Sequence, residues 1–160
     1  MTLDRWIEEA TAASPGPGRV AAALPLLRSL QPRWEALWER FWPDGPERGV
    51  AAGREGLALL ERVTRGEPVD EATLRAACAA MSEVATEVGD SGQDLDGEDD
   101  AGFAHLFTAL ATVALHEALG ERHPLYGFDD VALSAPMIVE TYPAVAAAFG
   151  GSRRSGPRRR

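Results

Sequence analysis

The sequence predicts an all-α fold: a single-domain bundle of about six to seven helices around a central apolar helix at about residues 100–119. Ala is abundant, and no segment shows the sustained alternation of apolar and polar residues that marks a strand. Apolar residues instead recur at intervals of three and four, between stretches rich in Pro and Gly. The chain has 160 residues, 45% hydrophobic and 26% charged, which suffices for one hydrophobic core. We expect one helical domain over residues 1–151 and a disordered Arg-rich tail over residues 152–160.

Three helices are predicted in the first quarter of the chain. The first covers about residues 2–13, with Thr as its N-cap, and a Pro- and Gly-rich stretch ends it. The next two are expected at about 19–30 and 32–42, because Pro32 lacks the amide hydrogen that a continuous helix uses. Pro25 is expected either to kink the second helix or to open its main segment.

The fourth predicted helix, at about 47–65, carries Gly49, Gly53 and Gly56 in its first half. Each glycine costs about 1 kcal/mol relative to Ala in a helix interior. Close approach of a neighbouring helix and backbone access for a ligand both explain such a run. We favour packing, because no strand precedes these glycines as one does in a phosphate-binding loop.

Two long helices follow. Asp70 caps the fifth helix, which ends at Gly89 and has one apolar stripe over four turns. The sixth, at about 100–119, is apolar on most of its circumference. A helix of that kind is normally surrounded by others, so we expect it at the centre.

The C-terminal region predicts two short helices. Ser134 stands before Ala-Pro, which is the pattern of an N-cap followed by Pro in the first turn. We therefore expect helices at about 135–141 and 142–149, with the second ended by Gly150.

The formal net charge of −9 is unevenly distributed along the chain. No basic residue stands between Arg75 and Arg122, whereas acidic residues are frequent there. The tail, in contrast, carries Arg153, Arg154, Arg158, Arg159 and Arg160. An acidic body repels nucleic acid, so nucleic acid is not expected as a partner, except through these tail arginines. No apolar run reaches the roughly 18 residues of a membrane span, so no membrane partner is expected.

The acidic segment after Gly89 resembles a calcium loop only in part. If Gly97 took the sixth position of such a loop, the first and twelfth positions would be Gly92 and Phe103, which cannot supply carboxylates. We therefore predict no metal there. We interpret the segment as a solvated acidic face that binds a basic partner protein. Its candidate partner-binding residues are Asp94, Asp96, Glu98 and Asp99.

A line of polar residues follows one side of the predicted central helix. His105 and His116 are eleven residues apart, or about 16 Å along a helix, so one metal ion cannot bridge them. Gly120 stands where a zinc-protease motif beginning at His116 needs its second histidine. The line is either a boundary of satisfied polar groups or the wall of a pocket. The candidate pocket residues are His105, Thr112, His116 and Tyr126.

The predicted helix at 32–42 carries several aromatic residues at core spacing. Part of this cluster is a candidate surface anchor for another protein, formed by Trp38 and Trp42. Trp42 is expected to be the more exposed, because it is the last residue before a Pro turn.

Other features narrow the class of protein. Cys78, the single cysteine, allows no internal disulfide and has no basic neighbour to activate it, so we expect it in the core. No nucleophile elbow or dinucleotide fingerprint is present. The N-terminus shows no basic leader followed by an apolar stretch, so no secretory signal is expected and a cytoplasmic location is predicted. The absence of Lys and Asn indicates a GC-rich, bacterial genome.

The sequence thus predicts a non-enzymatic protein-binding module of the immunity, anti-factor or regulatory type, without a cofactor. The alternative is a small-molecule-binding or enzymatic helical bundle that uses the His/Thr line of the central helix.

Overall fold

The computed structural model describes residues 2–90, 98–141 and 143–148. These residues form seven helices and no strand, which confirms the all-α prediction. The helices are α1 (Leu3–Ala12), α2 (Pro17–Phe41), α3 (Glu47–Thr64), α4 (Glu71–Asp90), α5 (Glu98–Leu119), α6 (Phe128–Thr141) and α7 (Pro143–Ala148).

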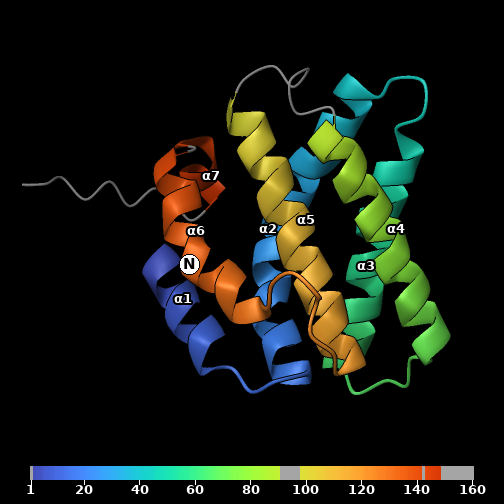
Figure 1. Cartoon of the computed structure of the whole chain (residues 1–160), viewed down its shortest axis with the longest axis vertical. Helices are drawn as coiled ribbons and strands as arrows, with labels where there is room; N and C mark the ends of the chain where they lie inside the picture. Colours follow the sequence, from blue (N-terminus) through green and yellow to red (C-terminus); the bar gives the residue numbers. More distant parts are fainter. Residues whose placement is uncertain (1, 91–97, 142, 149–160) are drawn as a thin grey trace, which may run out of the picture.

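Helix α5 lies at the centre of the bundle, as predicted. It packs against α4 and α3 on one side, α2 on another, and α6 and α7 on a third. Figure 1 shows α3 and α4 on one side of α5 and the smaller helices α1, α6 and α7 on the other. Phe107, Leu110 and Leu115 are among its fully buried side chains. Contrary to the expectation that no stretch is long enough for a membrane span, Asp100–Leu119 is long and apolar enough to cross a membrane by length and composition. However, 67% of it is buried within the bundle, as in a core helix.

Helix α2 is continuous, so the prediction of separate helices at 19–30 and 32–42 is wrong. Pro25 and Pro32 both lie inside it. Each proline removes the hydrogen bond to the carbonyl four residues earlier, at Ala21 and Arg28. All four residues are exposed, so water can satisfy these carbonyls while the buried leucines of the opposite face hold the helix together.

Helix α6 begins seven residues earlier than predicted. The positive end of the helix dipole stabilises two aspartates in the first turn. Gly127 N also donates a hydrogen bond to Asp130 Oδ2 at 2.7 Å. Ser134 does not cap a helix: its hydroxyl donates to Val131 O at 3.0 Å within α6. Pro136 is exposed in the helix interior. Helix α7 falls within the predicted range 142–149, and the predicted tail lies outside the described residues.

The glycines of α3 let α2 approach closely, as the packing interpretation predicted. A Cβ on Gly49 would overlap the indole ring of Trp38, and one on Gly53 would lie 3.0 Å from Trp34 Nε1. Trp34 Nε1 also donates a hydrogen bond to Gly49 O at 2.9 Å. Two tryptophans of α2 therefore occupy the space that larger residues of α3 would fill.

Candidate partner-binding site

A row of aromatic rings runs from the core to the surface at the end of α2. Trp34 stacks on Phe107 of α5 with ring centroids 4.6 Å apart, and Trp38 lies 5.7 Å from Trp34. Trp42 then stacks on Trp38, with centroids 4.2 Å apart and planes inclined by 24°. Trp38 is fully buried, which corrects its prediction as a surface anchor: the glycines of α3 give it a place in the core. Trp42, the C-cap of α2, is only partly buried.

An open groove of about 710 Å³ lies beside Trp42. The end of α2, the α2–α3 turn, the start of α3 and the last turns of α4 form it. Its lining residues are Phe41, Trp42, Pro43, Asp44, Gly45, Glu47, Arg48, Ala51 and Glu87. The groove combines an aromatic surface with charged side chains, and a cavity of this size suits a small molecule or part of a partner chain.

The charges around the groove are predominantly negative. Arg48 forms an ion pair with Glu87 and so links α3 to α4. Asp44 and Glu47 are exposed, and neither has a hydrogen-bond or ion-pair partner among the described residues. These two carboxylates leave the groove with a net negative charge.

The predicted acidic face lies in the sequence where two described helices, α4 and α5, are joined. Asp94 and Asp96 lie outside the described residues, as do the side chains of Glu98 and Asp99. The helix ends that flank the segment, the C-terminus of α4 and the N-terminus of α5, lie at the same end of the bundle as the α2–α3 turn (Figure 1).

Local contacts agree with this placement. Asp100, in the first turn of α5, contacts Arg33 at 3.4 Å and Arg40 at 3.7 Å, and both arginines belong to α2. Glu87, in the last turns of α4, lines the groove. The groove and the ends of the acidic segment therefore share one end of the bundle.

The His/Thr line of α5 does not form one continuous pocket wall. His105 is exposed, whereas Thr112 is buried close to the Tyr126 side chain. His116 instead meets His123 edge to face at 5.1 Å, and His123 lies 4.4 Å from Tyr126. The structure thus groups three of the four candidates through His123, which sequence reasoning missed because the loop after α5 carries no recognisable motif.

Burial controls the ionisation of this group. It lowers the pKa of His116 below the ordinary imidazole value, and the proximity of His123 lowers it further. Burial also raises the pKa of the Tyr126 phenol. His116 Nδ1 is buried without a hydrogen-bond partner among the described residues.

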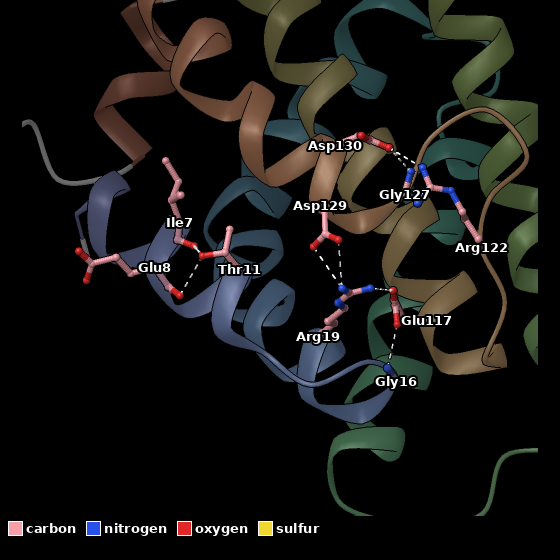
Figure 2. Close-up of polar contacts among 10 residues, drawn as sticks. All are labelled: Ile7, Glu8, Thr11, Gly16, Arg19, Glu117, Arg122, Gly127, Asp129 and Asp130. Carbon is pink, nitrogen blue, oxygen red and sulfur yellow. Dashed lines mark hydrogen bonds and ion pairs between the residues drawn. The ribbon is translucent and has the colours of Figure 1, made fainter.

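A second pocket, of about 250 Å³, opens beside His116 between the N-terminus of α2 and the loop after α5. Gly16, Arg19 and Glu117 line it, and Figure 2 shows the ion network that they form with Asp129. Arg19 contacts Glu117 at 2.7 Å and Asp129 at 3.1 Å, and Glu117 also accepts a hydrogen bond from Gly16 N at 2.8 Å. These contacts link α2, α5 and α6 across about a hundred residues of sequence, so no local pattern could reveal them.

Other candidate chemistry is limited in the described part of the chain. Cys78 is buried, and burial raises the pKa of its thiol to about 11, so it is protonated at neutral pH and poorly nucleophilic. Residues 2–90, 98–141 and 143–148 contain no group of three or more His, Cys, Asp or Glu side chains arranged to hold a metal ion. On the outer face of α6, Leu133 and Met137 are exposed one turn apart.

Comparisons with protein-family models, with curated proteins and with solved structures find no match to this chain.

Proposed function

We propose that this chain is a non-enzymatic protein-binding module, of the immunity, anti-factor or regulatory type, that binds a basic partner through the end of the bundle where α4 and α5 are joined. The observation that supports it best is the position of the Trp42 groove next to the helix ends that carry the acidic segment. A partly buried aromatic residue beside charged neighbours is the composition typical of an interface anchor. We also propose, from the composition of the sequence, that the protein is bacterial and that it is located in the cytoplasm.

The electrostatics favour a basic partner. A net charge of −9, with a run of acids between Asp90 and Asp100, attracts positively charged surfaces and accelerates their encounter. The arginines that contact Asp100 neutralise only part of this charge. Long-range attraction of this kind weakens as salt screens it.

The test begins with native mass spectrometry of the protein purified from its own host, which identifies a bound protein by its mass. Association of that partner is then measured by stopped flow over a range of salt concentrations. The variant Asp94→Asn/Asp96→Asn/Glu98→Gln should associate more slowly, by about tenfold at low salt, and show a flatter salt dependence.

A matched control removes three exposed acids from other helices, in the variant Glu8→Gln/Glu55→Gln/Glu140→Gln. It changes the net charge equally but leaves the proposed face intact. If both triple variants slow association by the same factor, general charge rather than this face attracts the partner. If neither slows it, the proposal fails.

A second candidate function is small-molecule binding in the pocket beside His116. Its supporting observation is the unpartnered Nδ1 of His116, a residue that lines this pocket. A small added mass in the same native spectrum, lost in His116→Gln but retained in His105→Gln, would support it. Loss in both variants or in neither would count against it.

A further inference from the structure

We propose that the Trp42 groove holds a cationic side chain, arginine or lysine, of the basic partner, so that the groove recognises one residue while the acidic segment attracts the partner at long range. This inference rests on the proposed function, because it names the chemical group that the same end of the bundle recognises. The argument depends on the rigidity of Trp42, the unpaired carboxylates beside it and a contact that recurs nearby.

Trp42 presents a fixed aromatic surface. One side of its ring stacks on Trp38, which is fully buried and cannot shift toward α3 without displacing the Gly49 backbone. Trp42 is also one of the residues that line the groove. A ring held in this way loses little conformational freedom when a ligand packs against it, which favours its use in recognition.

The charge beside the ring selects the sign of the ligand. Asp44 and Glu47 border the groove and have no partner in the described part of the chain, whereas Arg48 is already paired with Glu87. A cation over the ring gains attraction from the π face and from both carboxylates. An anion would be repelled by both, and a neutral apolar group would gain from the ring alone.

The same end of the bundle already contains this combination twice. The guanidinium carbon of Arg33 lies 4.6 Å from the centroid of Phe103, that of Arg40 lies 4.9 Å from the centroid of Phe41, and both arginines also contact Asp100. At Trp42 the ring and the carboxylates are present, but no cation lies over the ring among the described residues. The groove thus offers two components of a three-part contact, and a partner would supply the third.

The size of the groove fits a residue within a chain better than an isolated ion. About 710 Å³ exceeds what one guanidinium or ammonium group fills, and it leaves room for the aliphatic stem and the adjacent backbone. Arginine and lysine share the charge but differ in shape: the planar guanidinium can stack on the indole and bind both carboxylates, while the ammonium is a point charge. The experiment therefore compares the two.

The first measurement follows the indole N–H signals in ¹H–¹⁵N NMR spectra of the full chain during titration with blocked single residues. Trp6, Trp34 and Trp38 are fully buried, so Trp42 alone should respond. We expect N-acetylarginine amide to shift the Trp42 signal, N-acetyllysine amide to shift it less, and neutral N-acetylglutamine amide to leave it in place. Equal shifts with all three probes, or no shift with the cations, would overturn the proposal.

Variants then separate the ring from the charges. Trp42→Leu keeps an apolar residue but removes the π face, and should weaken binding of a blocked Gly-Arg-Gly peptide about two- to fivefold. Asp44→Asn/Glu47→Gln should weaken it comparably, whereas the control Glu8→Gln/Glu55→Gln should not. Near-ultraviolet circular dichroism checks that each variant folds. Trp42→Phe, which keeps a weaker π face, should retain part of the affinity; if it behaves as Trp42→Leu does, the ring contributes only apolar surface.

The failures of the two proposals are distinguishable. If neutralising the acidic segment slows association but Trp42→Leu leaves the affinities for the partner and for the Gly-Arg-Gly peptide unchanged, the protein-binding function stands and the groove proposal fails. The opposite outcome is that neutralising the acidic segment leaves the association rate unchanged while the arginine amide still shifts the Trp42 signal. In that case the groove binds arginine as proposed, but the proposed function fails.

Discussion

At the scale of single residues, the structure assigns different roles to side chains of the same type. Of the three histidines, His105 is exposed on α5, while His116 and His123 pack against each other where the loop after α5 folds back. Among the tryptophans near the end of α2, Trp34 and Trp38 are core residues and Trp42 lines a groove. Residue type and spacing indicated that these residues cluster. Which of them are buried and which are exposed became clear only from the structure.

His116 should make stability depend on pH. Because its pKa is lower in the folded state than in the unfolded chain, the unfolded state binds more protons in the window below the ordinary histidine pKa of about 6.5. The folded protein is therefore fully stabilised above this window and loses stability as the pH falls through it. His116→Gln should flatten the dependence of the urea midpoint on pH between about 7.5 and 5.

His105→Gln is the matched control for that measurement, since it removes an exposed histidine from the same helix. It should leave the pH profile close to that of the unaltered chain. A profile that is flattened by the control and not by His116→Gln would contradict the assignment.

At the scale of helices, packing overrides local sequence signals. Helix α2 passes through two prolines because both face solvent, and α3 tolerates glycines because α2 supplies tryptophans opposite them. The sequence predicted a close helix contact at these glycines, but not which helix makes it. That partner depends on the three-dimensional arrangement, since Gly49 and Trp38 belong to different helices.

Gly49→Ala should destabilise the protein, because the added methyl group meets the Trp38 ring and both neighbouring helices are fixed by other core contacts. We expect a loss of about 1–3 kcal/mol in the free energy of unfolding, measured by urea titration.

Gly89→Ala provides the control, because nothing lies within 4 Å of a Cβ at that position of α4. It should be neutral or stabilise by about 0.5–1 kcal/mol through helix propensity. If both substitutions have the same effect, the close approach of α2 to α3 is not what requires glycine at position 49.

At the scale of the whole molecule, the ion network around Arg19 connects segments that are distant in sequence. The hydrogen bond to Glu117 is the main reason that the pKa of Arg19 is raised, and both side chains are mostly buried, at 20% and 12% exposed. Glu117 also holds the Gly16 backbone between α1 and α2 (Figure 2). The network thus ties the N-terminal helices to the C-terminal half of the chain.

Arg19→Met should leave Glu117 without its cation in a poorly hydrated position. We expect a loss of about 1–3 kcal/mol of unfolding free energy, below the value for a fully buried pair because some solvent reaches this one. Arg122→Met removes an arginine whose bridge to Asp130 is exposed on both sides, and should change stability by less than about 0.5 kcal/mol. Equal thermal shifts in the two variants would show that the Arg19 network adds no more than a surface pair.

The sequence by itself determined the helical class, the place of the central helix, the close packing at the α3 glycines and the acidic character of the chain, because these follow from composition and from the periodicity of neighbouring residues. Only the tertiary structure decided that α2 is one helix, that Trp38 is buried while Trp42 lines a groove, and that Arg19 meets Glu117. Each of these depends on contacts between distant segments or on which face of a helix is exposed to water. A local sequence pattern contains neither kind of information.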